Sequence, residues 1–282
     1  MKIKSIAIIA LISLGSFLSG LKGRDFVKRN IYLPIRTSLK YSDIITLYKK
    51  ADCPVNSITI AIFGQSNSAN FVSEKSDLAI PSNLYQYDWE SQRCYLYKEP
   101  LLGTNSTKGN AITYTAIKMA NNSNKPIVII PFGLGATSVL RWAYGDLFLN
   151  RHQIVMKRIK ESGLSPRIFL WHQGESDSNL PEEVYYYALR KVVESTFNSF
   201  PHSSFGIALA TRCVYEPLNH LRNAQKRVSQ DLPNAFISGD SDKISGFDKR
   251  PDNCHFSAKG ASELGNLYYE SITREIKENT GI

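Results

Sequence analysis

The 282-residue sequence has no cysteine pair at C-x-x-C spacing, and it contains only four cysteines and five histidines. Zinc knuckles use cysteine pairs at short spacing, so this composition disfavours a metal site of that kind. Basic runs interleaved with aromatic residues are also missing, which disfavours a single-strand nucleic-acid binder. We find no internal repeat and no low-complexity tract. These absences indicate an ordinary globular protein without nucleic acid as a partner.

The net charge is positive, because 34 Lys and Arg stand against 25 Asp and Glu, a formal +9. Such an excess would suit an acidic polysaccharide or an anionic membrane surface. Since the basic residues form no concentrated run, we interpret most of this charge as a solvated surface.

An apolar run of membrane-spanning length is absent as well. Residues 6–18 are apolar and follow Lys2 and Lys4, but a spanning helix needs ~20 apolar residues. The sequence therefore predicts a signal peptide in residues 1–21 and a secreted or periplasmic protein. Basic residues at 22, 24, 28 and 29 resist translocation, so an uncleaved N-terminal membrane anchor is the alternative.

Hydrophobic residues make up 43% of the sequence, enough for one sizeable core. Residues 22–56 are mixed and basic and predict an irregular lead-in to one domain at 57–282. Five short apolar runs predict buried strands at 57–63, 126–132, 167–172, 205–211 and 234–239. Between and after them, helical spacing predicts helices at 110–122, 151–163, 181–197, 217–232 and 258–278.

This alternation predicts an α/β fold, a three-layer α/β/α sandwich around a five-stranded parallel sheet. Residues 72–108 have the weakest pattern and predict a long excursion over one edge of the site. Ligands of open parallel sheets bind beyond the carboxyl ends of the strands. Polar loops follow all five predicted strands there, with the sequences "GQSN", "GLGATS", "QGESD", "TRCVYE" and, after a longer stretch, "DNCH".

Ser66 lies in the first of these loops, where a strand turns sharply into a helix. A serine there exposes its hydroxyl near free backbone N–H groups, which suits a nucleophile, although serine is also a common helix N-cap. A nucleophilic serine needs a base and an orienting acid. His255 precedes the last predicted helix, and Asp252 stands three residues earlier, so the carboxylate can fold back onto the imidazole.

The other four histidines are weaker candidates. His152 and His220 fall in predicted helices and His202 in a polar turn, where a solvated histidine is expected, and His172 ends a strand beside the site. In "WHQGESD", the amide of Gln173 could donate to an oxyanion, while Glu175 either anchors the loop or acts as a second acid.

Together, "GQSN", "GLGATSVLRW", "WHQGESD" and "DNCHFS" resemble the SGNH-hydrolase superfamily, in particular its carbohydrate esterases of the sialate O-acetylesterase type. The resemblance covers about residues 57–277. It implies a flavodoxin-like fold and hydrolysis of acetyl esters on sugars, with no metal or other cofactor. Ser66 would be the nucleophile, with His255 and Asp252 completing the triad.

The same resemblance implies an oxyanion hole made of the Ser66 backbone N–H, the Gly109 N–H and the Gln173 side chain, with Gly103 in reserve for Gly109. Substrate-binding residues would come from Gln65, Asn67, Arg141, Trp142 and Glu175. Trp142 fits core packing equally well. Arg212 could meet a carboxylated sugar or be a surface cation.

The four cysteines are either buried thiols or two disulfides. Cys213 follows the fourth strand and Cys254 lies in the histidine loop, so we predict pairing of Cys213 with Cys254 and of Cys53 with Cys94. The expected partner is an acetylated carbohydrate. The expected activity is that of a serine esterase; a polysaccharide O-acetyltransferase with the same triad and a non-catalytic carbohydrate-binding protein are the alternatives.

Overall fold

The computed structural model describes residues 45–145, 150–214 and 216–280. The predicted signal peptide or anchor, 1–21, and most of the predicted lead-in lie outside these residues. The chain divides into two compact units, Met1–Tyr48 and Lys49–Ile282. Of the first unit only residues 45–48 are described, and there Tyr48 N donates to Ile45 O at 3.2 Å. The sheet and the helices named below belong to the second unit.

The second unit is built on one eight-stranded sheet in the order β1-β4-β3-β5-β2-β6-β7-β8. In this spatial order, all neighbouring strands from β3 through β5, β2, β6 and β7 to β8 are parallel. Strand β4 pairs antiparallel with both β3 and β1. The strands are β1 (Lys50–Ala51), β2 (Ile58–Gly64), β3 (Leu84–Asp88), β4 (Arg93–Leu96), β5 (Ile127–Pro131), β6 (Ile168–His172), β7 (Ser204–Leu209) and β8 (Ala235–Asp240).

The five predicted strands correspond to β2, β5, β6, β7 and β8, but the predicted five-stranded sheet is too small. Residues 72–108 contribute β3 and β4, which extend the sheet beyond β5 instead of forming only a loop. The lead-in 22–56 likewise contains the short strand β1. The sheet is therefore wider and partly antiparallel on the side where the sequence pattern is weakest.

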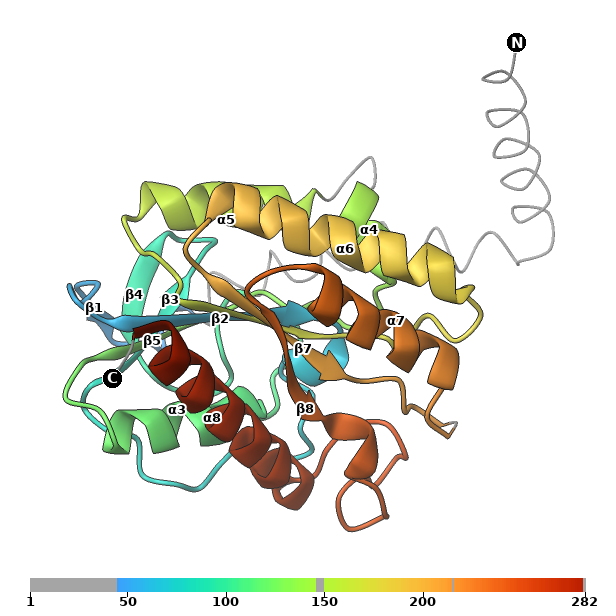
Figure 1. The fold of residues 1–282 in the computed structure, drawn as a ribbon. Helices are drawn as coiled ribbons and strands as arrows, with labels where there is room; N and C mark the ends of the chain where they lie inside the picture. Colours follow the sequence, from blue (N-terminus) through green and yellow to red (C-terminus); the bar gives the residue numbers. More distant parts are fainter. Residues whose placement is uncertain (1–44, 146–149, 215, 281–282) are drawn as a thin grey trace, which may run out of the picture. The chain divides into compact units, whose positions relative to one another are not determined.

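Helices cover both faces of the sheet, as the sequence predicts. Figure 1 shows α3 and α8 on one face and α4, α5 and α6 on the other. The helices are α3 (Ile112–Asn121), α4 (Val139–Tyr144), α5 (Arg151–Glu161), α6 (Glu182–Ser199), α7 (Asn219–Asp231) and α8 (Ala258–Thr280), with short 3-10 turns η1 (Ser66–Ser68) and η2 (Ser241–Lys243). Within the described residues, no helix is both long and apolar enough to cross a membrane.

Strand β2 shows how the two faces arise from sequence. Its side chains alternate, so Ile60 and Ile62 pack with α3 and α8, whereas Ala61 and Phe63 pack in the core beneath α4 to α7. All four are fully buried, which explains why the run is apolar throughout and not alternately polar. The carboxyl end of β2 therefore opens on one rim, between the ends of β5 and β6.

Candidate active site

The serine turn begins at Gly64, the last residue of β2. Gly64 has φ +125°, and a Cβ on it would lie 2.1 Å from the carbonyl oxygen of His172, so only glycine fits. In η1, Ser68 N donates to Gln65 O and Ala69 N to Ser66 O, both at 2.9 Å. The backbone N–H groups of Ser66 and Asn67 come before these two hydrogen-bonded donors. They therefore correspond to the first N–H groups of a helix, which have no acceptor within the helix. Ser66 itself is 5% exposed.

The Asp252–His255 loop has the arrangement expected from the sequence. Asp252 Oδ2 lies 2.7 Å from His255 Nδ1, while Oδ1 accepts the backbone N–H groups of Cys254 at 2.9 Å and His255 at 2.6 Å. Partial burial raises the pKa of Asp252, but these hydrogen bonds outweigh it and hold the pKa below its ordinary value. The carboxylate is thus ionised and orients the imidazole through Nδ1, leaving Nε2 as the nitrogen that can take a proton.

The serine turn and the histidine loop are joined directly. Asn67, next to Ser66, donates from Nδ2 to the carbonyl of Cys254, next to His255, at 3.1 Å. Cys254 is also bonded to Cys213, and Cys53 to Cys94, so both predicted disulfides are confirmed. The structure therefore brings together loops from the two ends of the domain.

A buried arginine stabilises the histidine loop, and sequence reasoning did not identify it. Arg250 is 1% exposed, and its guanidinium donates to Ile244 O at 2.7 Å, to Ser241 O at 2.9 Å and to Cys254 O. It also lies 3.9 Å from the centre of the Phe256 ring. Burial lowers the pKa of Arg250 to about 10, so it remains a cation at neutral pH. Its partners are backbone carbonyls, which no residue pattern reveals.

Gln173 lies beneath the rim, where its amide bonds within the protein. It is fully buried, and Nε2 lies 2.6 Å from Asp177 Oδ2, 3.1 Å from Thr137 O and 3.2 Å from Gln65 Oε1. Tyr185 OH donates to its Oε1 at 3.0 Å. In this structure the Gln173 amide therefore connects β6, α6 and the loop before α4 and is not directed at an open oxyanion site.

The glycine expected in the oxyanion hole is also engaged. Gly109 N donates to Val72 O at 3.2 Å, and Val72 N donates back to Gly109 O at 3.0 Å. Gly103, the reserve, is held by its carbonyl, which accepts from Trp89 Nε1 at 2.7 Å and Arg151 at 2.6 Å. The Gly109 N–H is thus not presented to a ligand in this structure.

Glu175 belongs to a buried polar network under the serine turn. Its Oε1 accepts from Asn67 Nδ2 at 2.9 Å and lies 3.3 Å from His172 Nε2, while His172 Nδ1 lies 2.7 Å from Tyr268 OH. Burial raises the pKa of Glu175, but the contacts with His172 and Asn67 outweigh it and lower the pKa. These contacts fit the expected role of Glu175 in anchoring the loop, since its side chain is 1% exposed.

The remaining expected substrate-binding residues lie at various depths. Gln65 is 3% exposed and accepts from Ser176 N at 2.9 Å. Trp142 packs against Phe63 in the core, and Arg141 is half-buried in α4. Arg212 pairs with Glu216 at 2.8 Å, which fits a surface cation. Of this set, Trp142 fits the core alternative.

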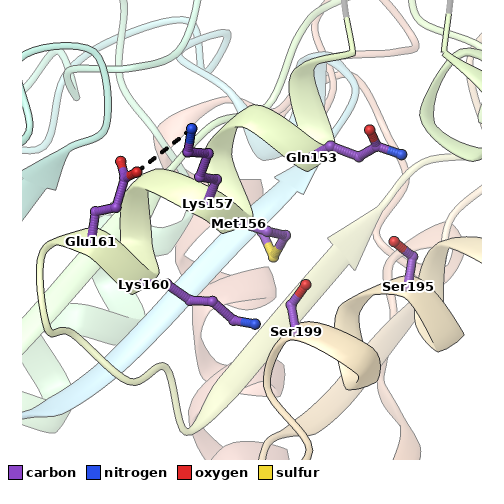
Figure 2. Close-up of a pocket in the computed structure, with 7 residues that line it drawn as sticks. All are labelled: Gln153, Met156, Lys157, Lys160, Glu161, Ser195 and Ser199. Carbon is purple, nitrogen blue, oxygen red and sulfur yellow. Dashed lines mark ion pairs between the residues drawn. The ribbon is translucent and has the colours of Figure 1, made fainter.

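Two hollows of the surface lie elsewhere. One of about 290 Å³ lies between α5 and α6, and Figure 2 shows Lys157, Lys160 and Ser199 around it. The other, of about 500 Å³, borders β1 and β4. Neither contains a residue of the expected site. Among residues 45–145, 150–214 and 216–280, no cluster of three or more His, Cys, Asp or Glu could hold a metal ion.

Comparison with solved structures supports the fold. A protein from Arabidopsis thaliana is 19% identical, with TM-score 0.60, and the match covers 77% of this chain and 98% of that one. A carbohydrate acetylesterase from Xanthomonas citri is 13% identical, with TM-score 0.55 and coverage of 77% and 56%. A carbohydrate acetylesterase from Sinorhizobium meliloti is 14% identical, with TM-score 0.51 and coverage of 77% and 99%. The chain thus has the fold of these α/β proteins.

Residues 58–274 match the model of the family described as "Carbohydrate esterase, sialic acid-specific acetylesterase" (SASA). The match spans most of the chain, so the chain belongs to this family and is a carboxylic ester hydrolase of the carbohydrate esterase class. No curated protein sequence matches it.

Proposed function

We propose that the protein removes O-acetyl groups from a carbohydrate, such as sialic acid, xylan or another polysaccharide, through an acyl-enzyme on Ser66. The supporting observation is the Asp252–His255 pair, with 2.7 Å between Oδ2 and Nδ1, held to the serine turn by the Asn67–Cys254 hydrogen bond. Membership of the carbohydrate esterase family supports the same reaction.

In the first half-reaction, Ser66 Oγ attacks the acetyl carbonyl carbon while His255 Nε2 takes its proton. Asp252 holds the imidazole in the required tautomer and stabilises the imidazolium that forms. The tetrahedral intermediate then expels the sugar oxygen, which receives that proton from His255. The sugar leaves with a free hydroxyl, and the acetyl group remains on Ser66.

In the second half-reaction, His255 takes a proton from water, whose oxygen attacks the acetyl carbon. Ser66 Oγ leaves with the proton, and acetate is released. We assign the negative oxygen first to the Ser66 backbone N–H, since the Gly109 N–H and the Gln173 amide have acceptors within the protein. Those two residues would join the oxyanion hole only if substrate binding rearranged them.

The test is hydrolysis of p-nitrophenyl acetate and of acetylated sialic acid and xylan by Ser66→Ala. We expect a loss of at least ~10³-fold in kcat with the fold retained, because the nucleophile is removed. Ser195→Ala, from the hollow between α5 and α6, is the control and should keep full activity (Figure 2). A folded Ser66→Ala protein with undiminished turnover would refute the proposal.

The products distinguish the rival activities. We expect free acetate as the main product even when a sugar acceptor is added. An excess of acetylated acceptor over acetate would identify an O-acetyltransferase instead. An intact protein that a fluorophosphonate probe does not label, and that still binds glycan, would be a carbohydrate-binding protein.

The two disulfides also bear on the cellular location of the protein. Cys53–Cys94 and Cys213–Cys254 persist in oxidising surroundings. We therefore propose a secreted or periplasmic location, which cell fractionation followed by thiol labelling would test. Protein recovered in the cytosol with four free thiols would contradict it.

A further inference from the structure

We propose that Phe71 is a positioning residue of this active site, because its ring holds the plane of the His255 imidazole. The two rings stack with centroids 5.2 Å apart and planes 21° from parallel. Phe71 comes shortly after the serine turn, and its backbone N–H donates to Ala69 O at 2.9 Å. The inference rests on the proposed role of His255 as the general base.

The need for such a contact follows from the exposure of the histidine loop. The side chains of His255 and Asp252 are 28% and 55% exposed. The hydrogen bond from Nδ1 to Asp252 fixes one atom of the imidazole, but a histidine ring rotates in a broad well about its second torsion. A ring packed on its face removes that rotation. Asp252 and Phe71 together therefore fix the direction of Nε2.

Gly135 supports Phe71 from the loop after β5. A Cβ built on Gly135 would lie 2.9 Å from Phe71 Cζ and 3.0 Å from Cε2, so a methyl group would displace the ring. Gly135 is not in the left-handed region, and alanine could adopt its backbone conformation. Its N–H donates to Asn105 Oδ1 at 3.0 Å, which holds the loop in place. A side chain at position 135 would therefore require the Phe71 ring to move from its place.

The first test compares kcat and KM of Phe71 variants on p-nitrophenyl acetate. Misplacement of a catalytic group by about 1 Å can cost ~10²-fold. For Phe71→Leu we expect kcat to fall about tenfold with KM and melting temperature unchanged. Phe71→Tyr, which keeps the aromatic face, should stay within about twofold of the wild type. The control is Phe247→Leu, whose side chain is 77% exposed, and it should leave kcat unchanged.

A double-mutant cycle then isolates the contact between Gly135 and Phe71. Gly135→Ala should lower kcat about fivefold in the wild type, because the methyl group displaces the Phe71 ring. In the Phe71→Leu background the same change should cost less than about twofold. Equal losses in both backgrounds would show that Gly135 acts by another route and would overturn this part of the proposal.

A readout independent of turnover keeps the inference separate from the proposed function. The Nδ1–H of His255 gives a low-field proton resonance when the bond to Asp252 protects it from exchange. We expect this resonance in the wild type and in Phe71→Tyr, and its broadening in Phe71→Leu. An unchanged resonance in Phe71→Leu would overturn the proposal. An inactive wild type with the expected broadening would instead refute the esterase function and leave the positioning role intact.

Discussion

Asn67 Nδ2 donates to the carbonyl of Cys254 at 3.1 Å, a contact between residues 187 positions apart in the chain. The same amide donates to the buried carboxylate of Glu175 at 2.9 Å. Asn67 stands directly after Ser66, and Cys254 directly before His255. The backbone segments that carry Ser66 and His255 are therefore linked through one side chain.

Asp252→Asn should abolish most of the activity without unfolding the loop. The asparagine Oδ1 can still accept the backbone N–H groups of residues 254 and 255, but its amide cannot hold the imidazole in the tautomer that accepts the serine proton. We expect kcat on p-nitrophenyl acetate at neutral pH to fall by ~10²- to 10⁴-fold. Asp248→Asn, whose exposed carboxylate pairs with Lys259, is the matched control. A loss of less than threefold would contradict the role of Asp252.

The two disulfides provide a comparison between stability and activity, because each joins cysteines 41 residues apart. Loop-closure entropy predicts a similar loss of about 3–4 kcal/mol for either pair changed to alanine. Only Cys213→Ala/Cys254→Ala should also lower kcat, since it frees the histidine loop. Denaturant unfolding and esterase assays on both variants measure this. Equal kcat in the two variants would show that the bond near His255 has no catalytic effect.

Arg250→Met should destabilise the protein strongly. It removes the guanidinium hydrogen bonds to the carbonyls of Ile244, Ser241 and Cys254, and a hydrogen bond from a charged group contributes about 1.5–3 kcal/mol. We expect a fall of at least ~3 kcal/mol in the free energy of unfolding in urea. Arg190→Met, which removes an exposed pair with Glu194, should change it little. Comparable effects of the two substitutions would contradict the assigned role of Arg250.

His152 should make the fold sensitive to mild acid. Contrary to the expectation of a solvated histidine, it is 3% exposed, and burial lowers its pKa from 6.5 to about 4. The unfolded chain therefore takes up a proton first as the pH falls. The contribution of neutral, buried His152 to the free energy of unfolding is complete above pH 6.5. It is lost progressively as the pH falls to about 4, a total of about 3 kcal/mol. The measurement is the free energy of unfolding of the wild type and of His152→Gln from pH 7 to 4.5. The difference between the two proteins should become smaller as the pH falls. A difference that does not change with pH would contradict this role of His152.

The central part of the fold was predictable because its strands are buried on both faces. Continuous apolar runs placed β2, β5, β6, β7 and β8 within about two residues. Strand β3 was missed because it carries Gln86 and Asp88, both fully buried. Gln86 is satisfied by Lys98 O and Leu102 N, and Asp88 by the N–H groups of the turn that follows. Hydropathy cannot anticipate such tertiary partners.

The site divides in the same way. Asp252 and His255 are close in sequence, and the "GQSN" turn is a local motif, so the contact between the two side chains and the turn at Ser66 could be predicted from residue types. The contributions of Phe71 and Arg250 depend on contacts with His255 and with backbone carbonyls. The roles of Ser66, His255, Asp252, Gly109 and Gln173 all remain predictions. The hydrogen bonds that Gly109 and Gln173 make within the fold could not be foreseen from sequence.

Strand β1, at the end of the sheet, is only two residues long and is followed by Cys53, which is bonded to Cys94 of β4. An open sheet edge can recruit a strand from another molecule and start fibrillar aggregation, and short edge strands with charged side chains prevent this. Lys50 and Arg93 supply exposed charge at this edge. Because the disulfide also ties Cys53, directly after β1 and Asp52, to β4, we expect this edge not to recruit a strand from another molecule.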